Sequence, residues 1–134
     1  MNLENKENKD ILTLEDIKAL VDTFYSRIRE DELLAPVFED RIKGNWEKHL
    51  DTMYRFWQTV LLEERTYQGS PGMKHITLPV GEAHFEQWLR LFYKTIDELF
   101  VGQKAQEAKW RAARMAEMFA QKISYFQRNK GGIL

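Results

Sequence analysis

The chain contains no cysteine, which excludes disulfides, thiolate catalysis and Cys-ligated zinc or iron–sulfur sites. It also has no excess of either charge: 20 Lys and Arg stand against 21 Asp and Glu, for a formal net charge of -1. This balance gives no electrostatic reason to expect binding to DNA or RNA. No apolar run reaches the roughly 18 residues of a membrane span, and the polar start MNLENKENKD lacks the apolar centre of a signal peptide. We therefore expect a cytoplasmic protein that binds neither nucleic acid nor membrane.

Motifs of the common enzyme classes are missing as well. The sequence has no GxGxxG, no P-loop, no HExxH and no nucleophile elbow around a serine. Its many carboxylates fall mainly on the polar faces of expected helices, where solvation is the ordinary explanation. Sequence motifs therefore assign no catalytic residue.

Aromatic residues are what the chain does have. They make up 13% of its 134 residues, with four Trp, five Tyr and eight Phe. Aromatic side chains carry large apolar areas and dominate both protein cores and ligand pockets. The simpler interpretation is a dense core in one domain, and the alternative is a pocket for a large flat ligand.

Apolar residues recur at helical spacing in long stretches, and no segment alternates as a strand would. The first stretch follows Thr13, a candidate N-cap, and fades near Asp31. The second runs from Trp46 to about Glu64, and the third and fourth are separated by Gly102. The expected class is all-α, with apolar stripes at Ile17, Leu20, Val21, Phe24 and Ile28; at Trp46, Leu50, Met53, Trp57, Val60 and Leu61; at Phe85, Trp88, Leu89, Phe92, Ile96, Leu99 and Phe100; and at Ala105, Ala108, Ala112, Met115, Phe119, Ile123 and Phe126.

Two irregular connections interrupt these helices. Pro36 marks a turn or a new short segment, and residues 65–74 read as a loop because they contain Gly69, Ser70, Pro71 and Gly72. A regular four-helix bundle would have shorter loops and heptad spacing throughout, so the pattern favours a more open, globin-like packing. We expect a polar tail over residues 1–12, one domain over 13–128 and a C-terminal tail over 129–134.

The three histidines are the natural candidates for a metal site. His49 lies at the edge of an apolar stripe, either as an exposed boundary residue or as a polar group at the mouth of a pocket. His75 follows the Gly/Pro loop and precedes Pro79 and Gly81, which limit any helix there to about one turn. It is either an ordinary loop histidine or a metal ligand on a short, pinned segment. His84 is expected to face solvent and has no assigned role.

Tyr25 and Trp88 each have an apolar body and a polar tip. If both point into one cavity, they offer an O–H and an N–H donor to a bound ligand. The other interpretation is that they are core aromatics whose tips find backbone partners.

In their order and spacing, several short strings resemble a group III truncated haemoglobin from about Ile17 to Phe126. They are Phe24-Tyr25, Pro36-Val37-Phe38, Trp46-Glu47-Lys48-His49, Phe56-Trp57, Leu61-Leu62, Tyr67-Gln68-Gly69, Lys74-His75, Leu78-Pro79, Phe85, Trp88-Leu89 and Leu91-Phe92. The resemblance implies a shortened globin fold, with helices stacked two over two around haem b. It places His75 as the proximal iron ligand and Tyr25, His49 and Trp88 as distal residues. Phe38 falls where the family has the aromatic residue that packs on the haem, and Met53 and Trp57 fall on the same helix face as His49. Leu78 and Phe85 are also expected in the haem pocket. Tyr67 and Lys74 are candidates, by position alone, for contacts with the haem propionates.

Three functions compete on this basis. The first is a haem protein, monomeric or weakly dimeric, that binds oxygen and other small ligands such as nitric oxide, carbon monoxide, cyanide or sulfide. The second is a redox enzyme that uses the same haem for nitric oxide dioxygenation or peroxidase-like chemistry. Since the chain has no reductase domain, that enzyme would need an external electron donor. The third is a haem-free helical interaction module, which predicts no visible absorbance.

Overall fold

The computed structural model describes residues 8–69 and 78–132, which form helices with no strand in either range. The helices are α2 (Leu14–Glu30), α3 (Ala35–Ile42), α4 (Trp46–Leu62), α6 (Glu82–Leu99) and α7 (Gln103–Gly132). Helices without strands in these residues confirm the all-α prediction. No helix of the described residues is long and apolar enough to cross a membrane.

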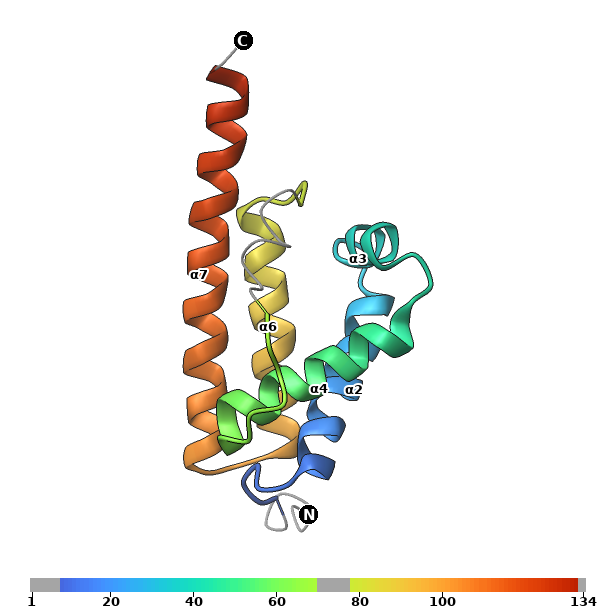
Figure 1. Cartoon of the computed structure of the whole chain (residues 1–134), viewed down its shortest axis with the longest axis vertical. Coiled ribbons are helices and arrows are strands. Elements are labelled where there is room, and N and C mark those ends of the chain that lie inside the picture. Colours follow the sequence, from blue (N-terminus) through green and yellow to red (C-terminus); the bar gives the residue numbers. More distant parts are fainter. Residues whose placement is uncertain (1–7, 70–77, 133–134) are drawn as a thin grey trace.

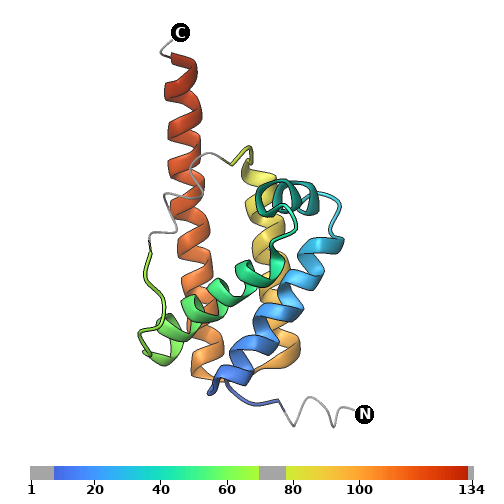
Figure 2. The ribbon, with the colours of Figure 1, turned by 45° about the vertical axis from the view of Figure 1, so that its right-hand side comes forward.

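The helices form two packed pairs. α6 and α7 run side by side, α2 and α4 make the second pair, and α2 also packs against α6 (Figures 1 and 2). The short α3 lies at the far end of α2 and α4, and the C-terminal part of α7 extends beyond α6 (Figure 1).

The core is built from the predicted stripes. Ile17, Leu20 and Ile28 of α2 are fully buried, and so is Ile96 of α6. On α7 the contact face is a row of small residues at helical spacing, and because side-chain size sets the distance between helix axes, α7 lies close to its neighbours. These buried residues are Ala105, Ala108, Ala112 and Ala116.

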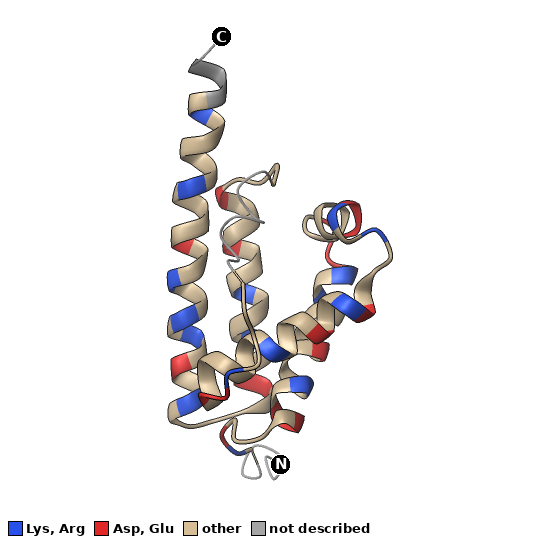
Figure 3. Cartoon of the chain, viewed as in Figure 1, with Lys and Arg blue, Asp and Glu red and all other residues tan. Residues whose placement is uncertain are grey.

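Charged residues of both signs are interspersed along the helices (Figure 3). Several form ion pairs between neighbouring helices, such as Lys109 of α7 with Asp97 of α6, or within one helix, such as Arg55 with Asp51 at 2.9 Å. Surface pairs of this kind contribute little to stability, so packing rather than charge holds the helices together.

Residues 8–12, just before α2, were predicted as part of a polar tail but pack against the rest of the protein. Ile11 is fully buried, and the carbonyl of Lys9 accepts a hydrogen bond of 3.0 Å from the amide of Val101. The Asp10 carboxylate accepts hydrogen bonds of 2.8 Å from the amides of Lys104 and Ala105, at the start of α7. A carboxylate there satisfies amides that the helix leaves unpaired and complements its dipole.

Gly102 makes room for this contact. Its φ of +138° lies in a region that favours glycine, and a Cβ there would come within 2.5 Å of the Asp10 side chain. At the other end of the chain, residues 129–132, predicted as a tail, continue α7.

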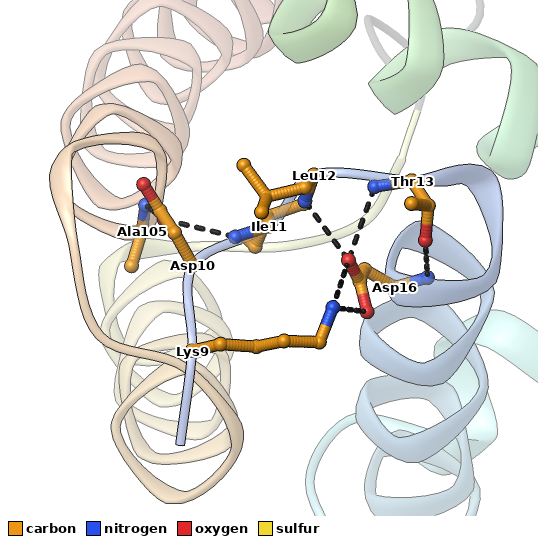
Figure 4. A network of polar contacts seen from close by, with 7 residues as sticks. All are labelled: Lys9, Asp10, Ile11, Leu12, Thr13, Asp16 and Ala105. Carbon is orange, nitrogen blue, oxygen red and sulfur yellow. Dashed lines mark hydrogen bonds and ion pairs between the residues drawn. The ribbon is translucent and has the colours of Figure 1, made fainter. Parts of the chain in front are cut away.

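The predicted cap of α2 is present. Thr13 is the N-cap, with its hydroxyl accepting from the Asp16 amide at 3.2 Å while the Asp16 carboxylate accepts from the Thr13 amide at 3.0 Å. That carboxylate also accepts from Leu12 at 2.9 Å and from the ammonium of Lys9 at 2.7 Å (Figure 4). Burial acts to raise the pKa of Asp16, but these hydrogen bonds outweigh it and hold the pKa below its ordinary value.

We expect Asp16→Asn to lower the free energy of unfolding by about 1–2 kcal/mol at pH 7, because the pair with Lys9 and part of the cap are lost. Since the folded-state pKa of Asp16 is depressed, its stabilisation is complete above the ordinary value of 3.8 and disappears as the pH falls through the folded value. Urea unfolding from pH 7 to pH 3 should therefore show the two proteins converging in acid. Asp40→Asn, at an exposed position on α3, is the control. A difference that stays constant with pH would contradict the assignment.

Candidate functional site

An apolar cavity of about 360 Å³ lies between the two helix pairs. Every helix of the described residues contributes to its wall, and so do residues on both sides of the undescribed segment 70–77. The lining residues are Phe24, Tyr25, Leu34, Val37, Phe38, Arg41, Ile42, Asn45, Lys48, His49, Thr52, Met53, Phe56, Trp57, Tyr67, Leu78, Val80, His84, Phe85, Trp88, Met115, Ala116 and Phe119. The volume falls within the range of small-molecule sites, roughly 300–1,000 Å³.

The three residues predicted to be distal line this one cavity although they come from three helices. Tyr25 of α2 is buried, and its ring meets the His49 ring of α4 edge-on at 5.0 Å. Trp88 of α6 is half-buried, with its ring 5.5 Å from Phe24, the neighbour of Tyr25. An O–H, an imidazole and an indole N–H thus belong to the lining of the same apolar space.

The helix periods explain why these side chains meet. Phe24 and Tyr25 are adjacent on α2, and the Phe24 ring contacts aromatic rings of α6 while the Tyr25 ring contacts rings of α4. His49 lies three residues after the buried Trp46, on the same side of α4, with their rings 5.8 Å apart. Trp88 stacks on Phe92 one turn further along α6, at 5.7 Å. Contacts with neighbouring aromatic rings therefore hold the side chains of His49 and Trp88 in the cavity wall.

The predicted pocket residues lie in the same wall. Phe38 is 6.0 Å from the Tyr25 ring, and Trp57 stacks on Phe92 at 5.3 Å. Met53, Leu78 and Phe85 also line the cavity, as does Tyr67, whose ring meets Phe56 edge-on at 5.2 Å. His75 and Lys74 lie outside the described residues.

His84 differs from its prediction. It is half-buried and lines the cavity rather than facing solvent, and its Nδ1 accepts a hydrogen bond of 3.1 Å from the Gly81 amide. The spacing of four residues between His84 and Trp88 was the available signal, since residues four apart share a helix face.

Other lining residues had no assigned role in the sequence. They include Phe56 of α4 and three residues of α7, namely Met115, Ala116 and Phe119. Met115 and Phe119 belong to the apolar stripe predicted for the last helix, but a stripe does not indicate which neighbour it will face.

Burial also sets the chemistry of the Tyr25 hydroxyl. It raises the pKa of Tyr25 far above the ordinary value of 10.0, because an ionised phenolate would lose its hydration in this apolar setting. The phenol is therefore neutral throughout the physiological pH range and can donate a hydrogen bond.

A model of the family described as bacterial-like globin matches residues 10–123 of the chain. The chain belongs to the bacterial-like globin family. A group 3 truncated hemoglobin of Campylobacter jejuni is 31% identical over 114 residues, which cover 82% of this chain and 90% of that protein. The crystal structure of a group III truncated hemoglobin from Campylobacter jejuni matches this globin with a TM-score of 0.79 at 29% identity, covering 87% of this chain and 94% of that chain. The predicted family and the shortened globin fold are confirmed.

Membership of the globin family implies a haem cofactor, and the cavity of this globin fits one. Flat aromatic rings form much of the wall, as expected for a site that receives a flat macrocycle. Tyr67 and Leu78, which lie on either side of residues 70–77 in the sequence, both line the cavity. Within residues 8–69 and 78–132, no three His, Cys, Asp or Glu side chains gather as they would around a protein-held metal ion.

Proposed function

We propose that this globin binds haem b and, through it, oxygen and other small ligands such as nitric oxide, carbon monoxide, cyanide or sulfide. Haem, when held by a single protein ligand, would supply an iron able to bind a diatomic molecule. The observation that supports the proposal best is that Tyr25, His49 and Trp88 line one apolar cavity. A haem-free interaction module has no need of such polar groups in an apolar wall.

His75 is the proposed proximal ligand. Support comes from its place in the sequence, within a segment whose two flanks line the cavity, and from the family to which the chain belongs. A neutral imidazole binds iron through one ring nitrogen while the other donates to a nearby acceptor.

Tyr25 is the proposed principal donor to a bound ligand. Its phenol is neutral and buried, and in a site that excludes water a hydrogen bond to a ligand with partial negative charge is stronger than in bulk solvent. The Trp88 indole can only donate, so it would favour the same kind of ligand. Two donors in an apolar space favour polar diatomic ligands over carbon monoxide, which is a weaker acceptor.

His49 is proposed to control access to the buried donors. Its ring contacts Tyr25, while Lys48 and Thr52 beside it on α4 also line the cavity. The imidazole thus contacts the buried phenol and has polar lining residues next to it on α4.

For His49→Leu we expect haem to be retained and the association and dissociation rates of oxygen to change by about fivefold, the equivalent of one ordinary hydrogen bond. Flash photolysis and stopped-flow measurements on the ferrous protein would check this. Unchanged rates would contradict a distal role for His49.

The proposed function is tested by ligand titration of the ferrous protein. Saturable spectral changes with oxygen and carbon monoxide, at one ligand per haem, are the expected result. Steady-state consumption of nitric oxide or peroxide with an external electron donor is measured on the same sample. Rapid turnover there would instead favour the redox enzyme, and a ferrous haem complex that binds no ligand would contradict both.

A further inference from the structure

The charged residues that line the cavity are all of one sign. Among the described lining residues, Arg41 and Lys48 carry charge, and no Asp or Glu accompanies them. The whole chain has 20 Lys and Arg against 21 Asp and Glu. The cavity lining therefore differs from the chain as a whole in having positive charges without negative ones. Both side chains belong to exposed residues, which places them at the rim of the cavity and not in its depth.

The two cations come from neighbouring elements. Arg41 is in the last turn of α3, and Lys48 is in the first turn of α4, directly after the short connection 43–45. Arg41 lies three residues after Phe38 and four after Val37, so the three side chains share one face of α3. All three line the cavity, with the charged residue nearest the end of the helix. Asn45 and Thr52 add uncharged polar groups to this stretch of rim.

An apolar cavity whose lining includes two cations from consecutive helices suits a ligand with an apolar body and carboxylates at one end. Haem has this form, since its two propionates project from one edge of the macrocycle. We propose that Arg41 and Lys48 bind the haem propionates, Arg41 with a planar fork that matches a carboxylate and Lys48 as a point charge. The inference rests on the proposed haem function and deepens it.

This assignment differs from the candidates that sequence position suggested. The Tyr67 side chain is half-buried with its ring against Phe56, and burial raises its pKa, so it offers a neutral hydroxyl rather than a charge. Lys74 lies outside the described residues. Arg41 and Lys48 lie on neighbouring helices, α3 and α4, which a short loop joins.

The test compares haem with haem dimethyl ester, in which both carboxylates are neutral. Each pigment is loaded into wild type, Arg41→Gln, Lys48→Gln and the double variant, and its transfer to excess apomyoglobin is followed by absorbance. We expect haem to leave each single variant about threefold faster than wild type and the double variant roughly tenfold faster, the upper range for exposed ion pairs. The ester should leave all four proteins at the same rate.

Lys94→Gln/Lys122→Gln is the matched control, because it removes two positive charges from exposed positions of α6 and α7 that do not line the cavity. It should lose haem at the wild-type rate. The proposal is overturned if the Arg41/Lys48 double variant also keeps the wild-type rate, or if it accelerates the loss of haem and ester equally, which would indicate a packing defect. Failure of wild type to take up either pigment would instead overturn the haem function itself.

Discussion

His75→Ala is expected to lose haem at least one hundred times faster than wild type and to give an altered Soret band. The proposed role of His75 is to supply the one protein bond to iron, and even groups that merely orient metal ligands change affinity by about 10–100-fold. The folded state would also lose the stabilisation that a tightly bound cofactor provides, so the apparent Tm in the presence of haem should fall. Haem transfer to apomyoglobin and thermal unfolding, each followed by absorbance, measure the two effects.

His84→Gln is the matched control. His84 lines the cavity, but the structure gives its Nδ1 a local task, accepting from the Gly81 amide at the start of α6. Glutamine at this third helical position can keep such a contact. Wild-type spectra and haem retention are expected for this variant. If His84→Gln loses haem and His75→Ala does not, the two assignments are reversed.

Tyr25→Phe should release oxygen about 10–100 times faster than wild type while keeping its haem. The substitution removes a hydroxyl that burial keeps neutral, and a hydrogen bond to a partly charged group contributes about 1.5–3 kcal/mol. Release from the wild-type protein should correspondingly be too slow for simple oxygen transport. Stopped-flow dissociation of oxygen from the ferrous protein measures both rates.

Two comparisons make this result specific. Carbon monoxide, the weaker acceptor, should leave Tyr25→Phe at nearly the wild-type rate. Tyr93→Phe removes a hydroxyl outside the cavity, one that donates to the Lys109 carbonyl at 3.4 Å, and should leave oxygen release unchanged. Fast oxygen release that does not respond to Tyr25→Phe would contradict the distal assignment.

The helices could be predicted because their signals are local. Thr13 is the predicted N-cap and forms a capping box with Asp16, and α2 ends at Glu30, one residue before the expected Asp31. α4 begins at the predicted Trp46 and ends two residues before the expected Glu64. Each signal depends on residues a few positions apart, so the sequence itself contains it.

The contacts that could not be predicted join distant parts of the chain. Residues 8–12 were predicted as part of a polar tail, yet Ile11 is buried and Asp10 binds the start of α7 more than 90 residues later. That contact depends on the space that Gly102 leaves. No sequence pattern near Asp10 indicates a contact with the start of α7, so the segment around Asp10 was predicted as a tail.

For the site too, some residues could be predicted from the sequence and others could not. Tyr25, His49 and Trp88 were expected from the family resemblance, and the structure brings them to one cavity. His84 and Phe119 were not assigned to the cavity, because helical periodicity identifies a face without identifying what that face will meet. Arg41 and Lys48 had no assigned role in the sequence, and the structure places both in the lining of the cavity.

The most direct test of the account is a titration of the purified protein with haem, followed by absorbance in the ferric, ferrous and carbon-monoxide-bound forms. We predict a Soret band that saturates at one haem per chain and shifts when carbon monoxide binds. His75→Ala should abolish this band or change its position. Absence of stoichiometric uptake would contradict the cofactor, the ligand assignments and the function together.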